Sequence, residues 1–538
     1  MNASQAHLDH FGSRRSTLVA PQGAVATSQP LAASAALERL RTGGNAFDAA
    51  VTAAAVLNVV EPTSTGIGGD VFALYRTADG HVEGMQSCGG APAAATRSAI
   101  ISRLDDDTDS PEMPFHGPHT VTVPGTTRGW EALLDRYGEA GLRSALQPAI
   151  EYAINGYPVT EVIASYWQHA DELFTDANAR AAYLPNDRPP QAGQLVRLPE
   201  LGSSLKQIAR EGADAFYEGA IAEAIVSTVT EKGGLLEYED LASFEPQFVE
   251  PIAADYRGAT IYELPPNNQG PLVLEALRIA EAVGATDYQL QSVDRLHRLI
   301  EAMKLAFHDG HHWVTDPDYV SVPTLWSDEW VRDRASRIGE TALDVGQLPP
   351  PGPRGENADT VLITVGDQEG NLVTVINSLF AGFGSGLVAG ETGIALQNRG
   401  ASFSLDPDHP NVIEPGKRPF HTLIPGIANL GTDDWAAFGV MGGHMQPQGH
   451  LQVITQLVRD ERPLQPALDH PRWRHNADGT LSVEPRMDPV VQTALVRRGH
   501  EVRVETPAAF GGAQIVRRRN GVLSAATEPR KDGTAIGY

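Results

Sequence analysis

The stretch Asn357-Ala358-Asp359-Thr360-Val361-Leu362-Ile363-Thr364-Val365 decides the fold of this 538-residue chain. A polar run rich in proline and glycine, residues 346–356, stands directly before it. Proline is excluded from the interior of a sheet, so this run predicts an exposed tether. A β-type run begins at Thr360. We therefore expect a strand to start at Thr360, and we expect the bond between Asp359 and Thr360 to be cleaved so that Thr360 becomes a new N-terminus.

A threonine at a chain terminus carries its own base. A threonine hydroxyl is a poor nucleophile unless a base lies beside it. The free α-amine of the same residue has a pKa of about 8, so a useful fraction is unprotonated near neutral pH. Cleavage before Thr360 would thus place nucleophile and base on one residue.

The segments after the tether form a predicted hairpin. Residues 360–365 and 371–379 flank Gly366-Asp367-Gln368-Glu369-Gly370, a turn-rich loop. If Val365 faces Asn371, then Thr360 faces Ile376, and Ser378 lies diagonally beside Thr360 on the same face of the sheet. The alternative interpretation is that Thr360 is an ordinary threonine of an edge strand.

Composition excludes several classes of partner. The net charge is −26 and the sequence pI is about 5.0, which argues against nucleic acid or an anionic membrane as partner. The one cysteine, Cys88, excludes an internal disulfide framework. Residues 1–15 are polar without an apolar signal segment, and no apolar run reaches the length of a membrane span. These features predict a cytoplasmic protein.

Other parts of the chain carry clear local patterns. Residues 17–27 predict a pair of strands joined by the turn Pro21-Gln22-Gly23. Residues 46–60 are apolar on all sides, which predicts a buried helix. Residues 433–441 predict a central strand that ends at Gly442-Gly443, with a helix beginning near Pro447. Backbone N–H groups without a partner at the start of a helix can donate hydrogen bonds to an oxyanion that develops during a reaction.

Short motifs in a shared order resemble the γ-glutamyltransferase family of the N-terminal-nucleophile hydrolase superfamily. Over about 450 residues they are Glu61-Pro62, Gly66-Ile67-Gly68-Gly69, Val123-Pro124-Gly125-Thr126, Gly233-Gly234-Leu235, Asp255-Tyr256-Arg257-Gly258, Leu264-Pro265-Pro266, Asp359-Thr360, Gly370-Asn371, Phe383-Gly384-Ser385-Gly386, Gly390-Glu391-Thr392-Gly393-Ile394, Arg418-Pro419 and Gly442-Gly443.

This resemblance implies an α+β fold, a four-layer αββα sandwich, made as a proenzyme. Self-cleavage would give a large subunit, residues 1–359, and a small catalytic subunit, residues 360–538, intertwined as one domain and able to pair into a heterotetramer. Thr360 matches the catalytic threonine, Ser378 the second hydroxyl residue that contacts it, and Gly442 and Gly443 the oxyanion hole.

Several departures from the family pattern concern the substrate. The family arginine that binds a glutamate α-carboxylate is absent from the stretch 87–92. The family's three ligands of the α-amino group are replaced by Phe380, Arg399 and Ser402, and a Ser-Ser pair is replaced by His421-Thr422. Arg399 would repel an ammonium and attract a carboxylate. With a short loop at residues 404–417, the pattern resembles the lidless branch, which includes the oxamate amidohydrolase type and acylase-like members.

The sequence therefore predicts a self-processing amidohydrolase or acyltransferase that cleaves an amide of a small acid-bearing substrate through an acyl-enzyme, with water or an amine as acceptor. Arg399, His421 and Thr422 are expected to receive the acid, with Phe380 and Ser402 beside them. One alternative is a γ-glutamyltransferase or glutathione hydrolase acting on γ-glutamyl compounds. A second is a scaffold or binding protein that never matures. No cofactor or metal is expected, although His308-Asp309-Gly310-His311-His312 has metal-ligating residue types.

Overall fold

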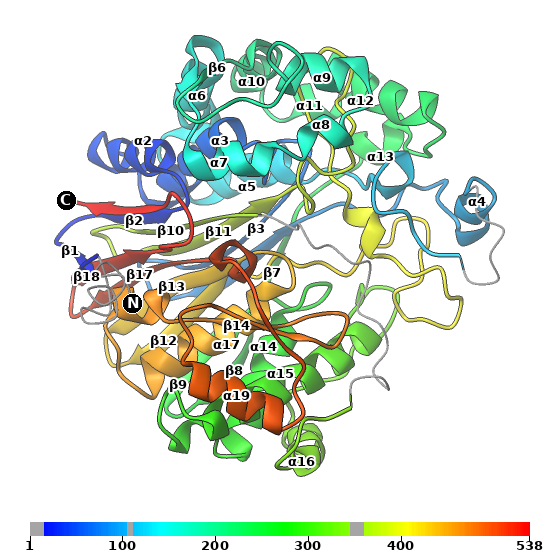
Figure 1. Cartoon of the computed structure of the whole chain (residues 1–538). Coiled ribbons are helices and arrows are strands. Elements are labelled where there is room, and N and C mark those ends of the chain that lie inside the picture. The colour runs from blue at the N-terminus through cyan, green and yellow to red at the C-terminus, as the bar shows by residue number, and fades with distance from the viewer. Residues whose placement is uncertain (1–14, 105–110, 345–359) are drawn as a thin grey trace.

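Two β-sheets stacked face to face between two layers of helices make up the computed structural model, which describes residues 15–104, 111–344 and 360–538. Figure 1 shows the four layers: helices of the N-terminal half above, the two sheets in the middle, and α14, α15, α17 and α19 below. This is the expected αββα sandwich. The predicted tether and Asp359 lie outside the described residues.

The first sheet has the order β19-β2-β10-β11-β3-β4-β7. Its strands are β19 (Thr534–Gly537), β2 (Ala24–Thr27), β10 (Val361–Gly366), β11 (Leu372–Ser378), β3 (Asp70–Arg76), β4 (Val82–Ser87) and β7 (Gln247–Val249). All pairings in this sheet are antiparallel. The two strands that follow Thr360 lie between strands from the N-terminal part, so the segments before and after Thr360 are interleaved.

The second sheet has the order β1-β18-β17-β13-β12-β9-β8. Its strands are β1 (Leu18–Ala20), β18 (Val522–Thr527), β17 (Gly512–Arg519), β13 (Asp434–Met441), β12 (Gly426–Gly431), β9 (Ala259–Glu263) and β8 (Ile252–Tyr256). Smaller sheets join β14 (Trp473–His475), β15 (Leu481–Val483) and β16 (Val502–Val504), and β5 (Tyr157–Pro158) with β6 (Leu195–Val196).

The helices divide between the two outer layers. The upper helices include α2 (Pro30–Arg41), α3 (Ala46–Val60), α5 (Thr126–Tyr137), α6 (Gly141–Asn155), α7 (Glu161–Trp167), α8 (Ala170–Leu173), α9 (Ala177–Tyr183), α10 (Pro199–Glu211), α11 (Asp214–Tyr217), α12 (Ala220–Glu231) and α13 (Tyr238–Ala242). The lower helices include α14 (Gly270–Ala282), α15 (Val293–Trp313), α16 (Asp328–Arg337), α17 (Met445–Val458), α18 (Leu464–Asp469) and α19 (Pro489–Arg497). Short turns of helix are α4 (Arg97–Ile101), η1 (Pro118–Thr120), η2 (Ala285–Asp287), η4 (Arg399–Ser402) and η5 (Pro507–Phe510).

Helix α3 is buried along its whole length, as its apolar sequence predicts. Asn45 caps it by accepting the N–H groups of Phe47 and Asp48, and the Asp48 side chain accepts the Asn45 N–H in return. Such a capping box satisfies N–H groups that the first turn leaves unpaired. Helix α3 shares a hydrophobic cluster with Val361 and Ile363, so it packs on the helix-facing side of β10.

The other side of β10 faces the second sheet. Leu362, Ile376 and Phe72 belong to the cluster between the sheets, together with Met441 at the end of β13. The hydroxyl of Thr374 crosses the gap and donates to the Gly426 carbonyl at 3.0 Å. Because side chains alternate along a strand, the residues two positions from Leu362, Ile376 and Phe72 also face the second sheet.

The hairpin register differs from the expected one by two residues. Val365 pairs with Val373, not Asn371, and Val361 pairs with Asn377. The cause lies in the turn, where Asp367 Oδ1 accepts the N–H groups of Gly370 and Asn371 and holds Asn371 outside the strand. A shift of two keeps every side chain on its face.

Strands β1 and β2 do not pair with each other, which corrects the expected strand pair at residues 17–27. Strand β1 pairs with β18 in the second sheet, whereas β2 pairs with β10 and β19 in the first. The turn at Pro21-Gln22-Gly23 therefore carries the chain from one sheet to the other. Strand propensity is local, but the choice of neighbour depends on strands hundreds of residues away.

Candidate functional site

Three polar residues form a row at one end of the first sheet, facing the second sheet. Ser378 pairs with Asp70 across β11 and β3. One step beyond the Val361–Asn377 pair, Thr360 comes opposite Ser378. All three side chains are buried among apolar strands. The structure thus brings the predicted nucleophile and its predicted hydroxyl partner together, directly opposite rather than diagonal.

A hydrogen bond joins the two hydroxyls. Thr360 Oγ1 donates to Ser378 Oγ at 3.2 Å. The same Ser378 oxygen accepts the backbone N–H of Phe380 at 2.8 Å. Ser378 therefore connects the candidate nucleophile to the loop that begins at Phe380, and this contact orients the Thr360 hydroxyl.

The Gly442-Gly443 loop lies between β13 and α17, as the sequence predicts. Gly442 has φ +115° and Gly443 has φ +55°, a region that glycine enters without strain. Neither N–H donates a hydrogen bond to an acceptor within residues 15–104, 111–344 and 360–538. Gly439 packs against Leu362, which sets the end of β13 over the start of β10.

Gln269 forms a hydrogen bond with the Gly442-Gly443 loop. Its Nε2 donates both to the carbonyl of Gly443, at 3.0 Å, and to the carbonyl of Thr422, at 2.8 Å. One buried amide thus fixes the predicted oxyanion loop relative to the predicted acid-binding segment. Sequence reasoning missed Gln269, although its Pro-Pro-Asn-Asn-Gln-Gly loop after β9 is a recognisable helix start.

Arg399 and Phe380 form a single unit. The guanidinium carbon of Arg399 lies 4.3 Å from the centre of the Phe380 ring, a cation–π contact. Phe380 adopts φ +80°, which turns its ring toward the arginine side. Nη1 of Arg399 donates to Thr422 Oγ1 at 2.8 Å. Three of the predicted acid-binding residues therefore meet in one place.

Arg399 is buried with unused hydrogen-bond donors. It is fully buried, and within the described part of the chain its Nε and Nη2 atoms have no hydrogen-bond partner. Burial lowers the pKa of Arg399 to about 10, while Asp70 opposes this shift. The side chain stays charged at neutral pH. A buried cation with two nitrogen donors that lack a partner is suited to bind a carboxylate in the plane of its guanidinium.

His421 is buried in a polar network. Its Nε2 lies 3.0 Å from Asp70 Oδ2, and its Nδ1 accepts the N–H of Leu423 at 3.2 Å. The ring stacks on Phe72 with centroids 4.4 Å apart. Both ring nitrogens are therefore engaged by the protein. Ser402 ends η4, where its carbonyl accepts from Asn411 at 2.7 Å.

Asp70, like Gln269, is a residue of this site that the sequence analysis did not identify. Its Oδ1 accepts from the Gly125 N–H and from Gln397 Nε2, each at 3.1 Å, and its Oδ2 faces His421. Burial raises the pKa of Asp70 to about 7, against the opposing charge of Arg399. An aspartate directly after Gly66-Ile67-Gly68-Gly69 was the available signal.

Cys88 is a buried free cysteine. Burial raises the pKa of its thiol to about 12, and the nearby Asp70 adds to this. A thiol of this kind is unreactive at neutral pH. The stretch around Cys88 instead supports the fold, because Ser87 Oγ donates to the Gly125 carbonyl at 2.6 Å.

One group of side chains in the described residues has atoms close enough to hold a metal, and it does not include the stretch His308–His312. It consists of His297, Glu301 and His500. His297 Nδ1 and His500 Nε2 are 2.9 Å apart, which a hydrogen bond between two neutral rings explains. Lys304 lies 2.8 Å from Glu301 and brings positive charge to the same place. This charge disfavours a cation, so the group is better explained as a hydrogen-bond network.

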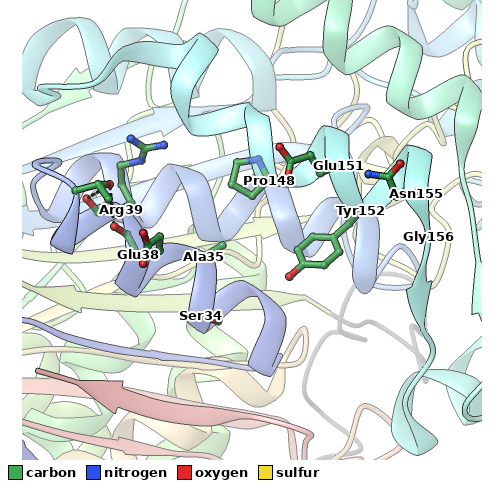
Figure 2. Close-up of a pocket in the computed structure, with 10 residues that line it drawn as sticks. Ser34, Ala35, Glu38, Arg39, Pro148, Glu151, Tyr152, Asn155 and Gly156 are labelled. Atoms are coloured by element: carbon green, nitrogen blue, oxygen red, sulfur yellow. Dashed lines mark hydrogen bonds between the residues drawn. The ribbon is translucent and has the colours of Figure 1, made fainter.

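A polar cleft of about 450 Å³ lies elsewhere, between α2 and α6. Figure 2 shows Glu38 and Arg39 from α2 on one side of it and Glu151 and Tyr152 from α6 on the other. Helix α2 covers the outer face of the first sheet, whereas Thr360 faces inward. The cleft contains none of the site residues described above.

Comparisons with known proteins agree on one family. The family model described as Gamma-glutamyltranspeptidase matches residues 32–538. The glutathione hydrolase-like YwrD proenzyme of Bacillus subtilis (strain 168) is 34% identical over 521 residues, covering 94% of this chain and 97% of that protein. The oxamate amidohydrolase proenzyme of Klebsiella pneumoniae is 35% identical over 542 residues, covering 97% of this chain and 100% of that protein.

A solved structure extends this agreement to the fold. The crystal structure of cephalosporin acylase from Bacillus halodurans matches with a TM-score of 0.90 and 43% sequence identity, covering 98% of this chain and 97% of that one. None of the helices in the described ranges combines the length and apolar character that crossing a membrane requires. The chain therefore belongs to the gamma-glutamyltranspeptidase family and is an N-terminal threonine hydrolase, a self-processing enzyme of the amidohydrolase and acyltransferase class.

Proposed function

We propose that the chain is cleaved between Asp359 and Thr360 and that Thr360 then hydrolyses the amide bond of a small substrate whose acyl part carries a carboxylate. Cleavage would give residues 1–359 and residues 360–538. Strands β10 and β11 lie between β2 and β3, so separating the two fragments would break the first sheet. The fragments should stay together as a heterodimer, which can pair further into a heterotetramer. With one cysteine and no disulfide to form, the cytoplasm is the expected compartment.

The mechanism needs one nucleophile, one base and one oxyanion hole. Thr360 Oγ attacks the amide carbonyl, and its α-amine accepts the hydroxyl proton and passes it to the leaving amine. Ser378 orients the hydroxyl. The N–H groups of Gly442 and Gly443 stabilise the oxyanion, an effect of about 3 kcal/mol per donor in comparable sites. The acyl-enzyme is then released to water, or to an amine acceptor in a transfer reaction.

The vacant fork of Arg399 is the observation that supports an acid-bearing acyl group. The Nε and Nη2 atoms of the buried Arg399 guanidinium lack partners in the described residues. Leaving buried donors unpaired costs free energy unless a ligand accepts their hydrogen bonds. Phe380 and Thr422 hold the fork in place. A substrate ammonium at this position would meet a fixed positive charge. Among the relatives, the one named oxamate amidohydrolase is consistent with this, because oxamate is an amide that carries a carboxylate.

The remaining predicted residues, His421 and Ser402, have different roles from Arg399 and Phe380. His421 uses both ring nitrogens within the protein, so we propose that it positions Thr422 rather than contacting the substrate. Ser402 ends η4, the same short turn of helix that begins with Arg399. Arg399, Phe380 and Thr422 make the contacts with the acid.

A panel of three amides with one shared leaving group tests this substrate class. Glutaryl, γ-glutamyl and pentanoyl p-nitroanilides differ in the acid and the ammonium of the acyl part. We expect the highest kcat/KM for the glutaryl compound. Arg399→Met should remove this preference, while Arg399→Lys, which retains the charge but not the fork, should keep part of it. Oxamate should also be hydrolysed. A kcat/KM for the γ-glutamyl compound well above that for the glutaryl compound, with rapid turnover of glutathione and none of oxamate, would instead favour a glutathione hydrolase.

Denaturing gel electrophoresis tests maturation. In proportion to the 57.5 kDa of the 538-residue chain, cleavage before Thr360 should yield bands of about 38 and 19 kDa. Thr360→Ala should give one uncleaved band and no activity, whereas Thr360→Ser should still mature, more slowly. A wild-type protein that remains one band under active conditions would support the scaffold alternative.

A further inference from the structure

Asp70 is linked to Arg399 through two consecutive residues, and the mechanism above does not use it: His421 Nε2 lies 3.0 Å from Asp70 Oδ2, and Thr422 Oγ1 accepts from Arg399 Nη1. Asp70 is fully buried at the start of β3, directly across from Ser378 on β11. Its charge acts on Arg399, which is also fully buried. A buried ionised carboxylate costs free energy unless it is hydrogen-bonded and paired with an opposite charge.

The hydrogen bonds around the Asp70 carboxylate suit its ionised form. Gly125 N–H and Gln397 Nε2 donate to Oδ1. His421 Nδ1 accepts from Leu423, so the proton of the neutral ring is on Nε2 and points at Oδ2. Donors therefore surround both oxygens of the carboxylate, and hydrogen bonds to the charged form favour it.

Asp70 offsets the charge of Arg399 without blocking its fork. No ion pair within 4.0 Å joins the two side chains in the part of the chain that the structure describes, yet each charge shifts the pKa of the other. The fork keeps Nε and Nη2 vacant. The site thus contains one positive and one negative charge, and two nitrogen atoms of the guanidinium have no hydrogen-bond partner in the described residues.

We propose that Asp70 is the resident counter-ion of Arg399, and that a substrate carboxylate takes over this role while Asp70 takes up one proton from solvent. This inference rests on the proposed acid-binding function of Arg399. Charge balance supports it: the occupied pocket would otherwise hold two carboxylates against one guanidinium, away from water. Two carboxylates that share a buried site favour protonation of one of them.

The pocket has a place for the added proton. Gln397 Oε1 is buried and has no partner in the described residues. Turning the Gln397 amide would present this oxygen to an O–H on Asp70 Oδ1 and to the hydroxyl of Thr122, now 3.1 Å from Nε2. The turn would give up the two longer contacts of Nε2, each 3.4 Å, with the carbonyls of Thr122 and Val123. Burial raises the pKa of Asp70 to about 7, so the proton is accessible near neutral pH.

The other titratable groups around Asp70 do not account for the same proton. Arg399 stays charged, and the Cys88 thiol, with its pKa raised to about 12, stays neutral. Burial raises the pKa of Tyr217 and lowers that of His421, so both stay neutral too. The α-amine of Thr360 after cleavage is the one competing group, and the experiment must separate it from Asp70.

Proton uptake on binding determines how the affinity for an acid changes with pH. A group protonated in the complex and ionised in the empty enzyme makes the affinity for an acid fall as pH rises. The fall approaches about tenfold per pH unit when one whole proton is taken up. It should begin near pH 7 and affect acid-bearing ligands, while a ligand without a carboxylate should show none of it.

Calorimetric titration of the mature enzyme with glutarate at pH 7.5, in two buffers with different heats of ionisation, measures this proton directly. Glutarate itself stays fully ionised at this pH. We expect an uptake of between about half and one proton per site in the wild type. Asp70→Asn should abolish the uptake. Glu263→Gln should retain it, because Glu263 forms an equally buried pair with His450, 2.7 Å apart, outside the pocket.

Each outcome decides between the two claims. Glutarate binding without proton uptake overturns the inference and leaves the proposed function standing. Uptake that persists in Asp70→Asn belongs to the Thr360 amine and also overturns it. If wild type fails to bind glutarate, the proposed acid-binding function fails, and the inference with it. Should Asp70→Asn fail to mature, infrared difference spectra of the wild type provide the test: a protonated-carboxyl C=O band must appear when glutarate binds, and its absence refutes the inference.

Discussion

Thr360 Oγ1 donates to Ser378 Oγ across the open end of the β10–β11 hairpin, 3.2 Å away. The same serine oxygen accepts the N–H of Phe380, whose ring lies against Arg399. One small side chain therefore links the candidate nucleophile to the pocket for the acyl group. The hairpin turn at Asp367 sets this alignment from the far end of the two strands.

Ser378→Ala should lower kcat by about 10- to 100-fold, because it removes the acceptor that orients the Thr360 hydroxyl and leaves the Phe380 N–H unpaired. Maturation should slow as well. Steady-state kinetics and a gel time course measure the two effects. Ser385→Ala is the matched control, since Ser385 is equally buried and donates to the Leu396 carbonyl at 2.8 Å. The prediction is wrong if both variants lose kcat to the same extent.

Gly442→Ala should reduce kcat by about 10²- to 10³-fold with little change in KM, since the oxyanion is bound in the transition state. A Cβ at this position would lie 3.0 Å from Gly511 Cα, and φ +115° disfavours alanine, so the loop must shift. Gly431→Ala provides a control for strain alone. Gly431 has φ +147° at the end of β12, with open space around it. An equal loss of kcat in that variant would contradict an oxyanion role.

Thr422→Val should raise KM for acid-bearing amides about tenfold while kcat changes less, because Nη1 of Arg399 loses its acceptor and the fork becomes less well oriented. Thr422→Ser retains the hydroxyl and should restore KM. Pentanoyl p-nitroanilide, which carries no acid, should show no difference among the three proteins. An unchanged KM for the glutaryl substrate in Thr422→Val would show that this contact is dispensable.

Stability should fall in mild acid, because buried histidines are held neutral. Burial lowers the pKa of His500 to about 3 and places the pKa values of His311 and His421 well below their usual range. In the unfolded chain these rings titrate near 6.5. The stabilisation is therefore complete above pH 6.5 and is lost as pH falls toward the folded pKa values, by roughly 1 kcal/mol per pH unit for each fully buried ring.

Thermal unfolding followed by circular dichroism from pH 7.5 to 5.0 checks this. The midpoint should decline steadily below pH 6.5. Carboxyls whose pKa burial raises, such as Asp70 and Glu275, act in the opposite direction and reduce the slope. His500→Gln should flatten the decline, since a glutamine takes up no proton in either state. A midpoint that stays constant over this range would rule the explanation out.

Local patterns predicted much of the fold and part of the site. The buried helix at Ala46–Val60, the strand that ends at Gly442-Gly443 and the hairpin after Thr360 all follow from runs of neighbouring residues. The ordered family motifs extended this to the αββα sandwich. The register was wrong by two residues because the side chain of Asp367, and not the glycines of the turn, determines where the second strand begins.

By itself, the sequence determined which residues could act: a threonine after a tether, a glycine pair after a strand, and an arginine where the family has a neutral side chain. Tertiary structure alone decided how they act together. Asp70 and His421 are 351 positions apart, and β1 and β2, only a turn apart, belong to different sheets. The physical reason is that propensity and periodicity act between near neighbours, whereas burial, charge compensation and a vacant hydrogen-bond donor depend on segments that meet only when the whole chain has folded.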